Sequence, residues 1–173
     1  YNRMKRTIGL ISLFVTLAIA SVNAQQYALI DMEYILNRIP AFENANKQLE
    51  SLSKKWQEEI DMEVSAVDAM YKQYQADLSF LAGEEKTKRE NEIVSKENQI
   101  QELRNHYFGT QGELFTQQEK LIKPIQDAIY EAVKEIATAL GYSVVVDRAS
   151  ATSIIFASPA IDISDQVLTR LGY

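Results

Sequence analysis

Apolar side chains recur every three or four residues over a long stretch in the first half of the chain. They fall at Phe42, Ala45, Leu49, Leu52, Trp56, Ile60, Val64, Val67, Tyr71, Tyr74, Leu78 and Leu81. Polar side chains fill most positions between them, and neither glycine nor proline interrupts the run. This spacing places the apolar residues on one face of an α-helix. It predicts a helix over residues 42–81, roughly 60 Å long at the usual rise per residue.

A second helical run follows a break at Gly83. Glycine readily adopts the left-handed conformation that ends helices, and Glu84 and Glu85 suit the positive N-terminus of the next helix. The run is close to a heptad and includes two glutamines: Ile93, Ile100, Leu103, Tyr107, Gln111, Leu114, Gln118, Leu121 and Ile125. Two long helices joined by a tight turn predict an antiparallel hairpin with one thin apolar seam and a mobile far end.

Pro124 lies inside a further helical pattern, where it should kink the helix. Beyond it the apolar face broadens, with Ile125, Ala128, Ile129, Ala132, Val133, Ile136, Ala137 and Leu140. A face of this width needs a body to cover it. The sequence therefore predicts a hairpin arm over residues 42–123 and a β-rich body built from residues 25–41 and 124–173.

Three short segments of the body have the composition of β-strands: residues 27–31, 142–147 and 153–157. In the second, Val144 to Val146 are consecutive, which predicts a strand buried on both faces. Gly141 should end the helix before it. A C-terminal helix should follow, capped by Ser164 or Asp162 and carrying Val167, Leu168 and Leu171.

The hairpin returns the chain to its start, so the first strand should pair with one of the two later strands. Three short strands and two short helices supply few residues to cover them, and exposed strand edges invite pairing with another chain. We therefore expect an α+β fold whose small β-sheet body is completed by other copies of the chain. The residues expected to carry this oligomerisation are Leu29, Ile30, Val144, Val146, Ile154 and Phe156.

The N-terminus has the pattern of a secretory signal peptide. Arg3, Lys5 and Arg6 precede an apolar stretch over residues 8–20, and small residues precede Gln25. The apolar stretch is shorter than the roughly 20 residues that span a bilayer. We expect residues 1–24 to be cleaved before Gln25, with Met4 as an alternative translation start, and the mature protein to be exported.

Charge and chemistry exclude several classes of protein. The chain has 18 basic and 24 acidic side chains, and loss of the signal peptide leaves 15 basic, which argues against nucleic-acid binding. The absence of cysteine excludes disulfides and thiol catalysis. His106 has no ligand or triad partner in its sequence neighbourhood, and the body aspartates suit strand ends and helix caps. We expect no enzyme activity, cofactor or metal.

Both ends of the mature chain resemble the Skp/OmpH family of periplasmic chaperones. The resemblance rests on "YALIDMEYILNRIPAFENANKQLE", on "KLIKPIQDAIYEAVKEIATALGYSVVVD" and on "IIFASPAIDISDQVLTRL". It implies a homotrimer in which three helical hairpins extend as tentacles from a central β-body. It also implies that unfolded outer-membrane proteins are held in the cavity between the arms without ATP. Client contacts would then be weak, multiple and reversible.

The charge of this chain departs from that resemblance. Residues 42–123 carry 11 basic and 16 acidic side chains, so they do not generate a uniformly positive field. Only Lys86, Lys88 and Arg89 form a basic cluster, near the hairpin tip, and acidic neighbours dilute it. Lipopolysaccharide or membrane-surface binding is therefore not carried over to this chain. Apolar and aromatic contacts should dominate client capture.

Five residues beside the main apolar stripe are the candidates for client contact: Met62, Met70, Phe80, Phe108 and Phe115. Flexible methionine and planar aromatic side chains suit binding to many sequences. Residues on the stripe, such as Tyr71, Tyr74 and Tyr107, are expected to fill the seam instead.

The alternative function is a structural coiled-coil adaptor that docks a specific cell-envelope partner. The sequence specifies neither the clients nor the opening of the arms, and from the residues alone it does not fix the number of subunits or the presence of lipid.

Overall fold

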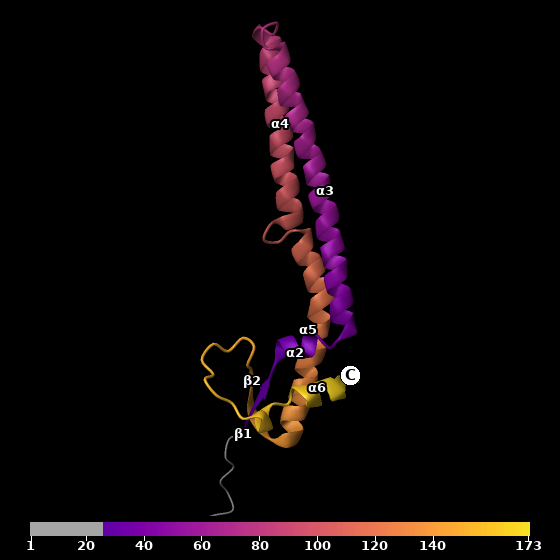
Figure 1. The fold of residues 1–173 in the computed structure, drawn as a ribbon, viewed down its shortest axis with the longest axis vertical. Helices are drawn as coiled ribbons and strands as arrows, with labels where there is room; N and C mark the ends of the chain where they lie inside the picture. The colour runs from indigo at the N-terminus through magenta and orange to yellow at the C-terminus, as the bar shows by residue number, and fades with distance from the viewer. Residues whose placement is uncertain (1–25) are drawn as a thin grey trace, which may run out of the picture. The chain divides into compact units, whose positions relative to one another are not determined.

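A computed structural model describes residues 26–173 and divides them into two compact units, residues 26–33 with 132–172 and residues 34–131. The elements follow the order β1 (Gln26–Ile30), α2 (Met32–Leu36), α3 (Pro40–Asp77), α4 (Gly83–Phe108), α5 (Glu113–Leu140), β2 (Tyr142–Asp147), η2 (Pro159–Ile161) and α6 (Ser164–Leu171) (Figure 1). Long helices with a small sheet confirm the predicted α+β fold.

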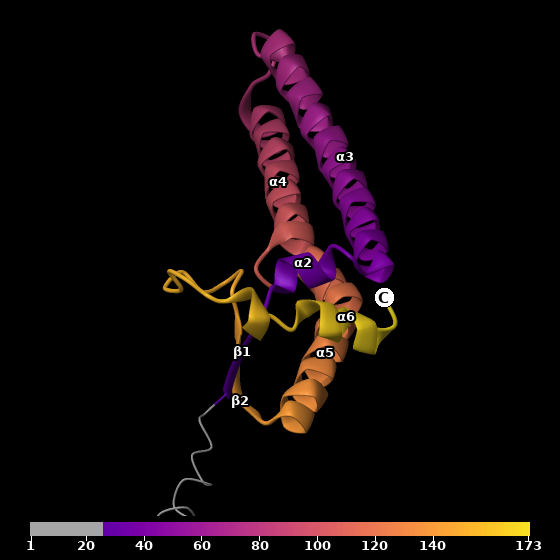
Figure 2. The same ribbon diagram turned by 60° about the horizontal axis from the view of Figure 1, so that its bottom comes forward.

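The first strand pairs with the second, one of the two partners that the sequence left open. β1 and β2 are parallel and in register from Tyr27 opposite Val144 to Ile30 opposite Asp147 (Figure 2). Parallel strands require a long crossover connection, and here the hairpin is part of that connection. On its other edge β1 contacts the C-terminal segment, because Ile163 N–H donates to the Leu29 carbonyl at 2.9 Å.

The predicted strand over residues 153–157 is wrong. This segment has no regular structure and follows a turn in which Ala151 N–H donates to the Asp147 carbonyl at 3.1 Å. Both edges of β1 are occupied, and the chain leaves β2 without returning along it. The sheet has two strands in the described part of the chain. Val144 is therefore 44% exposed in the single chain, not buried on both faces as predicted.

α3 and α4 form the predicted hairpin and lie side by side (Figures 1 and 2). α3 begins two residues before the predicted start because Pro40 occupies the first turn, where its missing N–H is not needed. α3 ends at Asp77, four residues before the predicted end. Gly83 has the expected left-handed conformation, at φ 56°, and opens α4.

The second long helix is not continuous. α4 ends at Phe108, residues 109–112 form a loop, and α5 begins at Glu113. Gln111 lies in the loop and Gln118 is exposed, so the predicted seam positions for both glutamines are wrong. α5 then runs through Pro124 without ending.

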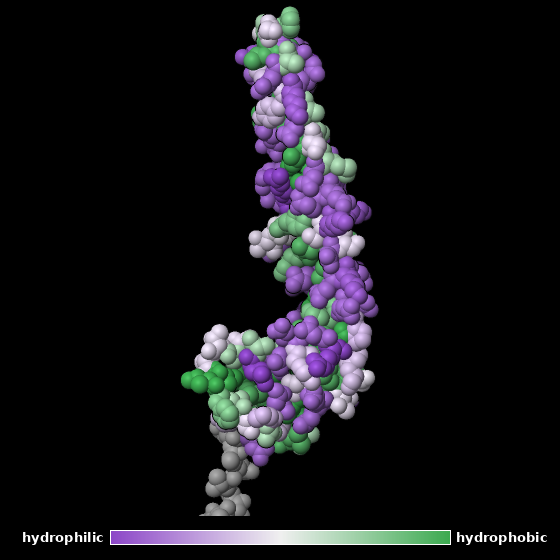
Figure 3. Space-filling view, viewed as in Figure 1, coloured by the Kyte–Doolittle hydropathy of each residue, from purple (hydrophilic) through white to green (hydrophobic). Residues whose placement is uncertain are grey.

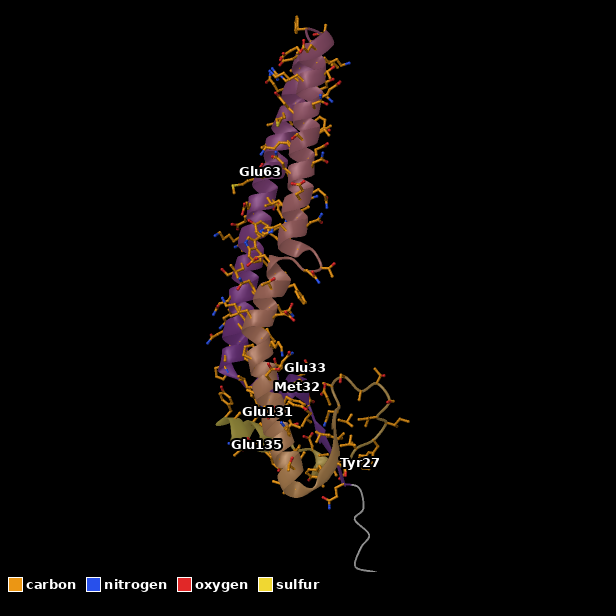
Figure 4. The ribbon with its side chains drawn as sticks, turned by 180° about the vertical axis from the view of Figure 1, so that it is seen from behind. Tyr27, Met32, Glu33, Glu63, Glu131 and Glu135 are labelled. Carbon is orange, nitrogen blue, oxygen red and sulfur yellow. The ribbon has the colours of Figure 1, made fainter. Side chains whose placement is uncertain are left out.

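The termini of the body helices combine predicted and unpredicted features. Gly141 takes a positive φ of 75° after α5, as expected. Ile163 occupies the N-cap position of α6, where Ser164 or Asp162 was predicted. Asp162 instead accepts the Ser164 N–H at 2.9 Å. The short helix α2, whose first residue Met32 is labelled in Figure 4, was not predicted. The Met32 N–H donates to Asp147 Oδ1 at 3.0 Å.

Candidate functional site

The arm has a narrow apolar seam along α3 and α4. Four residues buried to within a few per cent form its core: Ile60, Val67, Ile93 and Ile100. Val64, Met70, Tyr74, Leu103 and Tyr107 pack against this core. These are the residues whose spacing predicted the seam, with one correction. Met70 was expected beside the stripe as a client contact, but it is half-buried against the core.

Tyrosine hydroxyls tie the two helices together along the seam. Tyr71 donates to Glu97 at 3.0 Å and Tyr74 to Glu90 at 2.6 Å, both from α3 to α4. Tyr107 donates in the opposite direction, to Glu59 at 2.9 Å. The hydrogen bond to its glutamate is the main cause that raises the pKa of each tyrosine above 10. The phenols therefore act as structural donors. Tyr74 and Tyr107 also pack against the core, as predicted, whereas Tyr71 is 41% exposed and does not fill the seam.

One ion pair joins the same two helices. Lys96 on α4 lies 2.6 Å from Glu63 on α3, the residue labelled in Figure 4. Both side chains are more than a third exposed, so the pair adds less to stability than the apolar seam does.

An aromatic cluster lies where α4 ends. The ring of Trp56 stacks on Tyr107, with centroids 5.0 Å apart and planes 9° apart. Phe108 meets Trp56 edge-on at 6.4 Å. Offset and edge-to-face pairs of this kind stabilise packing beyond the area they bury. The only tryptophan of the chain thus reports on the junction between α4 and α5.

Four of the five predicted client contacts are accessible on the arm. Met62 is 68% exposed and Phe80, in the turn at the tip, is 88% exposed. Phe108 and Phe115 flank the loop between α4 and α5 and are 37% and 44% exposed. Hydrophilic residues cover most of the arm in Figure 3, and hydrophobic atoms show at its tip and partway along it. Apolar side chains are thus accessible at separate points along the arm.

The basic side chains near the tip are largely neutralised within the arm. Lys86 lies 3.8 Å from Glu90, and Arg89 lies 3.7 Å from Glu85. Two of the three basic residues therefore pair directly with acidic neighbours on α4.

A polar network organises the end of the sheet. Arg148 lies 3.5 Å from Asp31 and 3.3 Å from Asp162. Ser164 Oγ donates to Asp162 at 2.6 Å and accepts the Asp31 N–H at 2.8 Å. Burial alone would raise the pKa of Asp162, but hydrogen bonds from Ser164 and the charge of Arg148 lower it. These contacts join β1, β2 and the chain before α6.

Asp147 makes a second link at the same end. Its Oδ1 accepts the N–H groups of Met32 at 3.0 Å and Ala149 at 3.1 Å. Burial opposes the charge, but these hydrogen bonds, with those from Ser150, lower the pKa of Asp147. Asp147 therefore lies at a strand end, as predicted, whereas Asp162 holds the Ser164 amide of α6 from outside the cap position.

The residues predicted for oligomerisation divide into two groups. Leu29 and Ile30 are buried within the single chain. Val146 and Ile154 are half-buried, whereas Val144 and Phe156 are exposed at 44% and 84%. Ile155, which the sequence did not single out, is fully exposed beside Phe156. Together Ile155 and Phe156 expose a large apolar surface in the single chain.

No metal-binding group of three His, Cys, Asp or Glu side chains occurs in residues 26–173. The helices that the structure describes are all too short or too polar to cross a membrane. The predicted signal peptide lies outside the described residues.

Known proteins similar to this chain include chaperones. "Chaperone protein Skp" from Yersinia enterocolitica is 29% identical over 97% of this chain and 99% of its own length. The protein of the same name from Pectobacterium atrosepticum is 28% identical over 91% of this chain and 92% of its own length. These relatives have the name of a chaperone and not of an enzyme, in agreement with the expectation for this chain.

The fold and the family agree. The crystal structure of an OmpH-like outer membrane chaperone from Caulobacter crescentus CB15 superposes with a TM-score of 0.65 at 19% identity, covering 84% of this chain and 82% of that one. The family described as "Outer membrane protein (OmpH-like)" matches residues 26–171. This chain therefore belongs to the OmpH-like family.

Proposed function

We propose that this chain is a periplasmic holdase chaperone that binds unfolded outer-membrane proteins and prevents their aggregation without ATP. The observation that carries the proposal is the arm. It is a long hairpin with a narrow buried seam and with accessible apolar side chains along an otherwise polar surface. Membership of the OmpH-like family and relatives named as chaperones support it.

The client contacts in this proposal are Met62, Phe80, Phe108 and Phe115. Each is a single side chain with exposed apolar surface, so each contributes a weak contact and several must act together. Met70 is left out because it packs in the seam.

The active form in this proposal is a homotrimer that encloses its client between three arms. Exposed Val144, Ile155 and Phe156 support self-association through the body, because large apolar side chains at a free strand edge favour pairing with another copy. We further propose that residues 1–24 direct export and are removed before Gln25, and that residues 42–123 are the arm and residues 25–41 and 124–173 the body.

The test combines two measurements on residues 25–173. Light scattering should give three times the mass of one chain, and the protein should suppress aggregation of an outer-membrane barrel protein diluted from urea, with no nucleotide present. A monomer that leaves aggregation unchanged would contradict the proposal. Phe80→Ser should weaken protection while the trimer survives, and Ser95→Ala, at an exposed polar position of α4, is the matched control.

A further inference from the structure

The loop over residues 109–112 separates two helices, although the apolar spacing of the sequence continues through it. The apolar spacing passes from Tyr107 through Leu114 and Leu121 in steps that suit one uninterrupted helix. The structure nevertheless ends α4 at Phe108 and begins α5 at Glu113. Periodicity and structure therefore favour different conformations of the same segment.

Two glycines make the loop possible. A Cβ atom at Gly109 would collide with the backbone carbonyl oxygen of Asn105, and one at Gly112 would lie 2.8 Å from the carbonyl oxygen of His106. The loop is closed by two hydrogen bonds, from Gly112 N–H to the Gly109 carbonyl at 2.9 Å and from Thr116 N–H to the Gly112 carbonyl at 3.1 Å. In a continuous helix a Cβ at either position meets no such obstacle, and glycine is among the poorest helix formers. Glycine thus shifts the balance toward the loop.

α5 has apolar side chains for more than one register. Ile122 and Ile129 are buried, and the adjacent column of Leu121 and Ile125 is half-buried. In a continuous helix, Leu121 would lie on the same face as Tyr107. A rotation of α5 that replaced the column of Ile122 and Ile129 by the column of Leu121 and Ile125 would therefore exchange one set of apolar contacts for another.

The hydrogen bonds and ion pair described above between the two sides of the arm all lie before the loop. They join α3 to α4, at Glu59, Glu63, Tyr71 and Tyr74 of α3. These contacts therefore hold α3 and α4 together without involving residues 109–112.

We propose that residues 109–112 are a helix-to-loop switch, in which the loop described here exchanges with a continuous helix that runs from α4 into α5. In the continuous form Phe108 and Phe115 are seven residues apart, two turns on one helical face. The switch would then align two of the client contacts. That last consequence rests on the proposed function, whereas the switch itself does not.

The test uses the full chain with spin labels at Glu102→Cys and Glu119→Cys, which are exposed positions in a protein without native cysteine. In a continuous helix their backbones are about 26 Å apart, from the rise per residue. Gly109→Ala with Gly112→Ala should move the distance distribution to this value and slow amide hydrogen exchange across residues 110–115. Ser95→Ala should change neither. A double variant with the distances and exchange of the parent protein would overturn the proposal.

A second variant tests the opposite form. Thr110→Pro removes an amide that a continuous helix requires, and Gly109 already has the extended conformation, at φ −64° and ψ 168°, that a residue before proline adopts. It should abolish any population near 26 Å in the parent protein, and persistence of that population would contradict the switch. If the alanine variant has shifted distances but protects clients as well as the parent protein does, the switch is supported and its link to client binding is overturned.

Discussion

At the scale of single residues, the carboxylates of the body act as acceptors that join distant parts of the chain. Asp147 lies at the end of β2 and binds the first amide of α2, which is 115 residues away in sequence. Asp162 likewise holds Ser164 and Arg148. Each of these contacts requires the charged form or is strengthened by it.

Acid should therefore destabilise the body through these two residues. The folded-state pKa of Asp147 and of Asp162 is lowered from 3.8, so their stabilisation is present above this value and is lost as pH falls through the folded-state pKa. Denaturant unfolding measured between about pH 6 and pH 2, a range set by about two units on either side of the carboxyl pKa, should show this loss. Asp147→Asn, which keeps an acceptor oxygen, should reduce it. An identical acid dependence in the variant would contradict the assignment.

The seam tyrosines should respond to alkali instead. The pKa values of Tyr71, Tyr74 and Tyr107 are raised above 10 by their hydrogen bonds to glutamate. Their stabilisation is thus complete below pH 10 and disappears as pH rises through the folded-state values. Ultraviolet titration should show a late phase of tyrosine ionisation, and replacement of these three residues by phenylalanine should remove it. A titration curve whose late part is the same in the variant would refute this reading.

At the scale of elements, the arm depends on a seam one residue wide. Ile60 is 1% exposed and belongs to a four-residue core, so Ile60→Ala should destabilise the hairpin by about 2–5 kcal/mol. Met62→Ala, at a 68% exposed position of the same helix, should have little effect. Denaturant unfolding followed by the fluorescence of Trp56 measures both, because Trp56 stacks on Tyr107 across the seam. Similar losses in the two variants would show that the seam does not hold the arm.

At the scale of the whole molecule, the body leaves a strand edge and an apolar loop uncovered. Val144→Asp should dissociate the assembly, because a charge buried against another copy lacks a partner, while the single chain tolerates it at a 44% exposed position. Light scattering should then give the mass of one chain with unchanged helix content by circular dichroism. Ser95→Asp on the arm introduces the same charge and should leave the mass intact. Equal dissociation by both would point to net charge and not to the strand edge.

The sequence by itself determined what depends on local chemistry. Helical spacing along Trp56, Ile60 and Val67 is visible without a structure, because burial on one helical face imposes its own period. The left-handed turns at Gly83 and Gly141 follow from the absence of a Cβ. The return of the chain by the hairpin predicted that β1 pairs with one of two later segments, and the structure selects β2.

Only the tertiary structure decided features that depend on competition between partners. The segment over residues 153–157 has strand composition but pairs with neither strand, because both edges of β1 are taken and the chain does not return along β2. α2 begins where it does because Asp147 reaches its first amide from the far end of the chain. The loop at residues 109–112 departs from an apolar pattern that continues in phase, because two glycines permit a backbone path that other residues would block. Periodicity records which face a residue prefers, whereas contacts between distant residues decide which of several allowed conformations is occupied.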